Sequence, residues 1–240
     1  MANEYLKRTP TSTGNKKVFT ISTWLKSQED GSGVFLFNAE SSGADNGFYF
    51  GFSSGMLHIG TWTTGWQWFV QPSKLLRDYS GWWHVLIAVD TTQTTESDRA
   101  NIYINGVKET SFSTENYPTL NYDTLANDTK LHAIGRWGSY DGGYLDASLS
   151  DFYLVDGQAL TPDVFGFYKD GDGYQSSGTS QATDFRNGQW SPHSPKKIKK
   201  DINRRGGFGV NGFYLPMNDS SNPGADFHCD PNSIDRKSVV

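Results

Sequence analysis

Several features that would define a class of protein are scarce in this sequence. Cysteine occurs once, at Cys229, so no internal disulfide can form and the redox compartment stays open. No apolar run reaches the length of about 18 residues that marks a membrane-spanning helix. The first residues lack the apolar stretch of a secretion signal. We therefore expect a protein with no membrane insertion and no classical export signal.

A strong excess of charge is also missing. The chain has 21 basic and 26 acidic residues and a net charge of −5, which gives no electrostatic reason to expect nucleic-acid binding. Hydrophobic residues make up only 35% of the chain, but aromatic residues make up 15%. Few aliphatic and many aromatic residues fit a β-sandwich whose core consists of large rings. The 26 glycines indicate many tight turns.

Helical periodicity is nearly absent, and short strand-like stretches recur instead. In one of them Phe48, Phe50 and Phe52 share a face, with Tyr49 on the opposite face. Asn105-Gly106 between two strand-like segments is a strong hairpin signal, because both turn positions need a positive φ. The pattern predicts an all-β, antiparallel two-sheet sandwich over about residues 5–165, with a short helix at 161–165 that Thr161 caps. The other expected strands are 18–26, 33–37, 56–62, 66–70, 82–90, 101–104, 130–137 and 148–155.

The character of the sequence changes after about residue 166. We assign 1–168 to the sandwich and 169–240 to an irregular, loop-rich C-terminal extension, with a basic run at 196–205 and a possible last strand at 212–216. One interpretation makes the extension a docking arm that becomes ordered on a partner protein. The alternative is that 212–216 adds a strand to the domain's own sheet. The candidate docking residues are Lys196, Lys197, Lys199, Lys200, Arg204, Arg205, Phe213 and Tyr214.

Catalytic motifs occur in the wrong context. Gly51–Gly55 matches a serine nucleophile elbow, but a second strand follows it instead of a helix. Gly207–Gly212 matches a dinucleotide-binding fingerprint, but no strand precedes it. Glycoside hydrolysis needs two facing carboxylates, and Asp146, Asp151 and Asp156 lie five residues apart, so that neighbours face opposite sides of a strand. We therefore predict that the protein is not an enzyme.

Tryptophan rings provide the candidate binding site. Aromatic faces stack on the apolar faces of sugars, and the candidate glycan-binding residues are Trp62, Trp66, Trp68 and Trp137. Strand alternation places Trp66 and Trp68 on one face. A core role is the competing interpretation for each ring.

No metal or cofactor is required by the sequence. None of the five histidines is paired at the spacing of a transition-metal site. Asp170 and Asp172 offer oxygen ligands in a Gly-rich turn, so calcium stays open. The alternative is a solvated acidic turn, because the terminal bidentate carboxylate of a full calcium loop is missing.

Six segments of the sequence together resemble a known family. The run Leu149–Pro162 reads LSDFYLVDGQALTP and resembles a signature of laminin-G-like, concanavalin A-like domains in tailed-phage proteins. The segments 5–10, 19–24, 83–92, 102–107 and 211–216 are similar to other parts of that group. The resemblance spans about residues 5–217. It implies a jelly-roll sandwich in a virion protein, and it supplies no catalytic residues.

Two hypotheses about function follow from the resemblance. In the first, the protein is a virion structural component, in a tail fibre or as capsid decoration, that contacts other virion proteins and forms a homo-oligomer. In the second, it is an adhesin that binds host-surface glycans. Both imply synthesis in the host cytoplasm and a final location in the virion. An exposed aromatic ring in a concave pocket would favour the adhesin, and a large apolar interface would favour the structural role.

Overall fold

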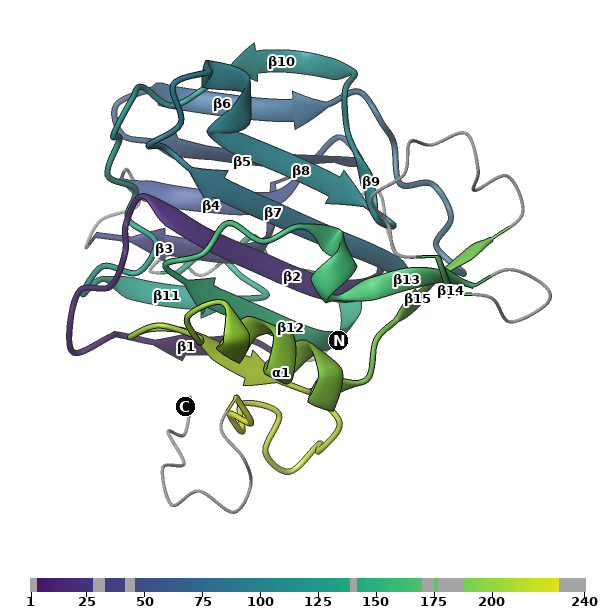
Figure 1. Cartoon of the computed structure of the whole chain (residues 1–240). Helices are drawn as coiled ribbons and strands as arrows, with labels where there is room; N and C mark the ends of the chain where they lie inside the picture. Colours follow the sequence, from purple (N-terminus) through teal and green to yellow (C-terminus); the bar gives the residue numbers. More distant parts are fainter. Residues whose placement is uncertain are drawn as a thin grey trace.

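The computed structural model describes residues 4–27, 33–41, 46–138, 142–169, 175–176 and 188–228. These residues form two antiparallel sheets stacked face to face, with a small third sheet and a helix beside them. Figure 1 shows the six-stranded sheet in front of the seven-stranded sheet, with helix α1 across its front. The predicted all-β two-sheet sandwich is confirmed.

The seven-stranded sheet is ordered β1-β11-β3-β4-β5-β6-β10. Strands β3 to β6 follow one another along the chain and form its centre, where tight hairpins connect β4 to β5 and β5 to β6. The strands are β1 (Leu6–Arg8), β3 (Val34–Glu40), β4 (Gly47–Ser53), β5 (Met56–Trp62), β6 (Trp66–Pro72), β10 (Phe112–Asn116) and β11 (Leu131–Ile134).

The six-stranded sheet is ordered β16-β12-β2-β7-β8-β9, and the small sheet is ordered β14-β13-β15. The strands of the six-stranded sheet are β2 (Val18–Ser27), β7 (Trp83–Asp90), β8 (Ala100–Ile104), β9 (Val107–Lys108), β12 (Ala147–Asp156) and β16 (Phe213–Leu215). The remaining elements are β13 (Gly166–Lys169), β14 (Gln175–Ser176), β15 (Gln189–Pro192), the 3-10 helices η1 (Glu96–Asp98) and η2 (Pro162–Val164), and α1 (Pro195–Arg204).

The main core lies between the two large sheets and contains eight aromatic rings among 26 buried hydrophobic residues of the described ranges. Phe48, Phe50 and Phe52 point into it from β4, as the alternation predicts. Phe19 of β2 meets Phe48 edge to face at 5.3 Å between ring centroids. Isoleucine, leucine and valine side chains fill the spaces between the rings and outnumber them, so the expectation of a core that consists of large rings is met only in part.

Two Gly-containing turns have the conformation that their sequences predict. Asn105 and Gly106 have φ values of 48° and 81° between β8 and β9. Ser54 and Gly55 have φ values of 54° and 73° between β4 and β5. The Gly51–Gly55 motif is therefore a hairpin turn and not a nucleophile elbow, as the sequence context indicated.

The short helix expected at 161–165 is the 3-10 helix η2, with Pro162 as its first residue. Its cap differs from the prediction, because the side chain of Thr161 makes no capping hydrogen bond. The hydroxyl of Thr161 bonds the carboxylate of Asp163 instead.

The prediction of an irregular extension is wrong for the described residues from 188 to about 217. β15 pairs with β13, so the predicted boundary at residue 168 falls within a paired strand. β16 pairs with β12 over Phe152–Leu154, which confirms the alternative that 212–216 adds a strand to the domain's own sheet. The basic run is helix α1 with its C-cap residue Arg205, and the lysines that suggested a loop lie on either side of the buried Ile198.

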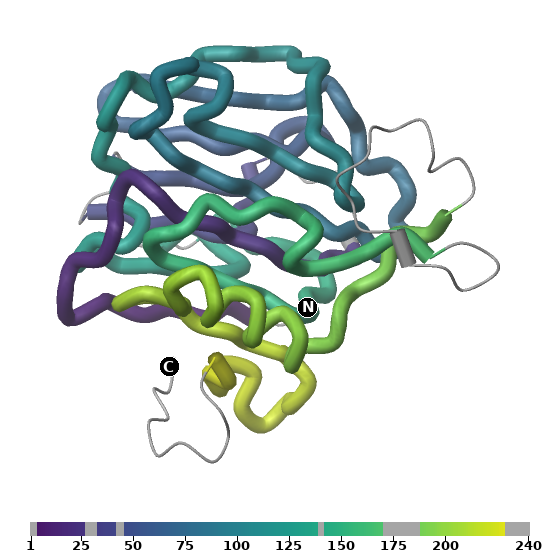
Figure 2. Tube along the Cα trace, in the orientation of Figure 1, coloured from purple at the N-terminus to yellow at the C-terminus, as the bar shows by residue number. Residues whose placement is uncertain are grey.

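Helix α1 packs on the outer face of the six-stranded sheet. Ile198 and Ile202, four residues apart, are buried against a second cluster that includes Leu86 of β7 and Val155 of β12. This cluster explains why β7 is apolar on both faces. Gln158 donates from Nε2 to the carbonyls of Ile202 and Gly207 and so ties the C-terminal end of α1 to the sandwich. Figure 2 shows the segment that follows α1 close to the N-terminal strand β1. Arg8 of β1 donates to the carbonyl of Asn211 in that segment.

Candidate functional site

The outer face of the seven-stranded sheet carries a continuous layer of rings, which we call the aromatic face. It consists of outward side chains of β3 to β6 and one ring from the segment after β11. Because inward residues of the same strands fill the core, the alternate residues must point away from it. The members are Phe35, Tyr49, His58, Trp62, Trp66, Phe69 and Trp137.

Trp66 is at the solvent side of the aromatic face, with 40% of its surface exposed. Its ring lies 4.4 Å from that of Phe69 and 5.3 Å from that of Trp62, to which it is nearly perpendicular at 85°. The more buried rings of Tyr49 and His58 lie behind it at 6.4 Å and 6.1 Å. These contacts fix the Trp66 ring while they leave part of it free for a ligand.

Glycines on the same face give the rings room to lie close to the sheet. A Cβ on Gly60 would lie 2.9 Å from a ring atom of Trp66 and 2.6 Å from the Trp68 carbonyl. A Cβ on Gly47 would lie 2.5 Å from the ring of Tyr49. The alternation of glycine and aromatic residues in 47–51 and 58–60 is thus the sequence signal that could have identified the buried members Tyr49 and His58.

Trp137 is held over the aromatic face by buried polar groups of β3. Its Nε1 donates to Glu40 Oε2 at 3.0 Å, and Glu40 is only 1% exposed. Asn38 donates to the Arg136 carbonyl at 2.5 Å. Arg136 in turn donates to the carbonyls of Trp137 and Gly138, at 2.8 Å in both cases. The Trp137 ring lies 5.4 Å from Phe35 and so forms one end of the layer.

Three of the four candidate glycan-binding tryptophans come together here. Trp62, Trp66 and Trp137 all belong to the aromatic face, but Trp68 is fully buried in the core and cannot contact a ligand. The expectation that Trp66 and Trp68 share a face is therefore wrong. The pairing shifts register between Thr61 and Trp62, so that simple alternation fails between positions 66 and 68.

The members that the sequence analysis missed give the face its chemistry. Burial lowers the pKa of His58 to about 4, so its imidazole is neutral near pH 7. Strands β4, β5 and β6 contain no charged residue. An uncharged layer of rings can stack on an apolar surface.

The remaining predicted site residues are the docking and calcium candidates. Phe213 and Tyr214 are 2% and 4% exposed within β16, so they are not free to dock a partner and that prediction is wrong. The basic candidates on α1 and its C-cap are exposed, except for Lys199, which is half-buried and donates to the Phe227 carbonyl; the exposed ones are Lys196, Lys197, Lys200, Arg204 and Arg205. Asp170 and Asp172, the calcium candidates, lie outside the described residues. Within the described ranges, no three His, Cys, Asp or Glu side chains group as metal ligands, and no helix is long and apolar enough to cross a membrane.

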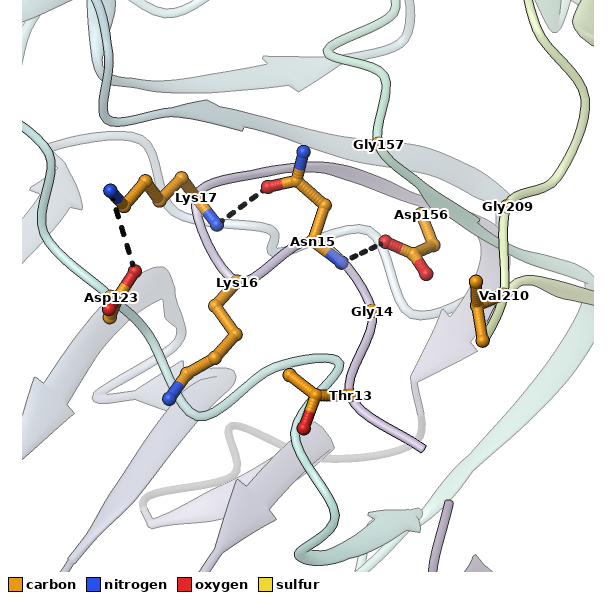
Figure 3. Close-up of a pocket in the computed structure, with 10 residues that line it drawn as sticks. All are labelled: Thr13, Gly14, Asn15, Lys16, Lys17, Asp123, Asp156, Gly157, Gly209 and Val210. Atoms are coloured by element: carbon orange, nitrogen blue, oxygen red, sulfur yellow. Dashed lines mark hydrogen bonds and ion pairs between the residues drawn. The ribbon is translucent and has the colours of Figure 1, made fainter. Parts of the chain in front are cut away.

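An open depression of about 550 Å³ lies at one end of the sandwich, between the segment before β2 and the loop after β12 (Figure 3). The carboxylate of Asp156 lies at its base and accepts from the backbone N–H groups of Asn15 at 2.7 Å and Asn211 at 3.0 Å. Lys17 pairs with Asp123 at 3.8 Å across one side. Since the two Asp156 oxygens are engaged in holding loops together, the depression is a structural junction.

The sheet arrangement and the aromatic face define a lectin-like β-sandwich. The chain belongs to the concanavalin A-like lectin/glucanases superfamily, whose family model matches residues 2–164. No curated protein matches the sequence.

The chain is also similar to solved structures, at low sequence identity. Domain 4 of the arabinanase AbnA from Geobacillus stearothermophilus is 19% identical, with a TM-score of 0.46 over 62% of this chain and 64% of that one. Domains LG4-5 of the mouse laminin α1 chain are 16% identical, with a TM-score of 0.45 over 67% of this chain and 41% of that one. The chain thus spans less than two thirds of the length of either structure.

Proposed function

We propose that this chain is a non-enzymatic, exposed component of a tailed-phage virion that binds host-surface glycans through the aromatic face. The observation that carries the proposal is the convergence of Trp62, Trp66 and Trp137 on one uncovered sheet face, with Trp66 40% exposed. Within the described residues, the extension covers the six-stranded sheet and leaves this face open. The virion location is supported by the resemblance of Leu149–Pro162 to tailed-phage domains.

The absence of enzyme activity is part of the proposal, and the carboxylates of the seven-stranded sheet support it. Its strands carry only Glu40 and Glu115. Four strand spacings of about 4.8 Å separate β3 from β10, so the two carboxylates are about 19 Å apart. Glycoside hydrolysis needs a separation of about 5 to 9.5 Å. Glu40 is also buried and accepts from Trp137.

A second candidate function is a structural role in which the chain contacts other virion proteins and forms homo-oligomers. The exposed basic side chains of α1 favour it, because the rest of the chain is acidic and a partner with acidic groups would orient on this helix. In this role the aromatic face would be buried against a neighbour in the particle.

Glycan binding is tested with the purified protein on an array of bacterial surface glycans, with Trp66→Ala and Trp82→Ala as variants. Trp82 is a matched control, because it is 46% exposed and belongs to no ring pair of the aromatic face. We expect Trp66→Ala to lose binding at least about tenfold and Trp82→Ala to keep it. Equal loss in both variants, or no glycan bound by the wild type, would contradict the proposal and favour the structural role.

A further inference from the structure

We infer that the aromatic face accepts one neutral pyranose ring at a time and discriminates against uronic, sialic and phosphorylated sugars. This inference rests on the proposed function, since it names the class of glycan that the same site takes. Two independent features carry it: the distribution of charge around the rings and the angle between Trp62 and Trp66.

The first feature is the absence of a free cation at the described part of the face. An anionic sugar in a stacked position needs a lysine or arginine for its carboxylate or phosphate. Strands β4 to β6 have none. Arg136 is the nearest in sequence to Trp137, but its guanidinium donates to two carbonyls and lies 4.2 Å from the ring of Tyr5.

The charges elsewhere in the described part of the sheet do not replace the missing cation. Lys7 of β1 is exposed, but strands β11 and β3 separate β1 from β4. With the net charge of −5, an anionic sugar is repelled before it reaches the rings. A neutral sugar loses no binding free energy to this repulsion.

The second feature is the right angle between the exposed ring of Trp66 and the half-buried ring of Trp62. Trp62 and Trp66 are 5.3 Å apart and 85° from coplanar. Two coplanar rings would support successive residues of a flat chain. A perpendicular pair forms a corner, in which one pyranose stacks on Trp66 while the Trp62 ring borders its edge. The site therefore fits a terminal or branching sugar residue.

The test compares neutral methyl hexopyranosides with the matching methyl uronides by NMR titration of the full chain at low ionic strength. We expect the uronides to bind at least about threefold more weakly. Neutral oligosaccharides of three to six residues should bind within about threefold of the monosaccharide, because one ring carries the contact. An affinity that rises more than about tenfold with chain length would overturn the single-ring assignment.

A lysine placed at the corner should reverse the discrimination. Thr64 is exposed in the turn between Trp62 and Trp66, so Thr64→Lys adds a cation there without touching the core. We expect it to raise uronide affinity at least about threefold relative to the neutral sugar, and the control Thr64→Gln to leave the ratio unchanged. Wild-type binding of uronides as tight as of neutral sugars, and lost in Trp66→Ala, would overturn this inference and leave glycan binding intact. Failure of every saccharide to bind would overturn the proposed function itself.

Discussion

At the scale of single residues, Asp156 connects three distant parts of the chain. It ends β12, and its carboxylate accepts from the backbone of Asn15 and Asn211. Asn211 also donates from Nδ2 to the carbonyls of Ser12 and Asn127. Next to Asp156, Gly157 has a φ of 89°, and Gln158 holds the end of α1. The run Asp156-Gly157-Gln158, on which the family resemblance depends, is thus explained by loop and helix attachment and not by ligand binding.

Replacing Asp156 with alanine leaves the buried backbone N–H of Asn211 and the partly buried N–H of Asn15 without an acceptor. We expect Asp156→Ala to lower the free energy of unfolding by about 3 kcal/mol. Asp123→Ala is the control, because Asp123 is exposed and pairs with Lys17 at 3.8 Å, and it should cost less than about 1 kcal/mol. Urea unfolding measures both values, and an equal effect of the two substitutions would contradict the assigned role of Asp156.

Three buried histidines make stability depend on pH. Burial lowers the pKa values of His58, His84 and His132 to about 4, 3 and 4, below the ordinary 6.5. Below pH 6.5 the unfolded chain takes up protons that the folded chain refuses until near pH 4, so the unfolded state gains stability as pH falls. Each histidine should therefore reduce the free energy of unfolding by about 1.4 kcal/mol per pH unit in this window.

Urea unfolding at pH 7 and pH 5 checks the histidine prediction. Most carboxylates stay ionised over this interval, so the loss reports on histidine. A protein equally stable at both values would show that these three side chains are not buried in the neutral form.

At the scale of elements, helix α1 could not be predicted from the hydrophobic pattern of the sequence. Only Ile198 and Ile202 mark its buried stripe, and the lysines around them suggest a solvated segment. The start signal was present, because Ser194 accepts from the Lys197 N–H and Pro195 is the first helical residue. The central strands could be predicted because their apolar and aromatic residues follow the alternation of a β-strand. β1 and β10 were missed because they are short, polar edge strands whose only support is pairing with distant segments.

The packing of α1 predicts that the helix is stable in the isolated protein. Ile202→Ala should cost about 3 kcal/mol of unfolding free energy, whereas Lys196→Ala on the exposed side should cost less than about 0.5 kcal/mol. Hydrogen exchange of the isolated chain should show protected amides at 198–204 and 213–215. Full exchange of both segments within seconds would restore the docking-arm interpretation.

At the scale of the whole molecule, the two sheets have different surroundings. Helix η2, together with α1 and Phe208 of the extension, covers the outer face of the six-stranded sheet. In the described part of the chain, the outer face of the seven-stranded sheet is covered by its own rings and by the segments that contain Trp137 and Gly143. The candidate tryptophans could be chosen from composition, but their assembly could not. It depends on the register shift at Trp62 and on glycines that make room for the rings.

The proposed function requires that the aromatic face is the ligand-binding surface of this protein. The most direct test is an NMR titration that follows the indole N–H signals of the eight tryptophans while a neutral glycoside is added. We expect the indole N–H signals of Trp62, Trp66 and Trp137 to shift. The signals of the exposed Trp82 and the core residue Trp68 should stay unchanged. Shifts confined to Trp82 or Trp190, with the signals of the aromatic face unmoved at saturation, would place the ligand elsewhere and contradict the proposed function.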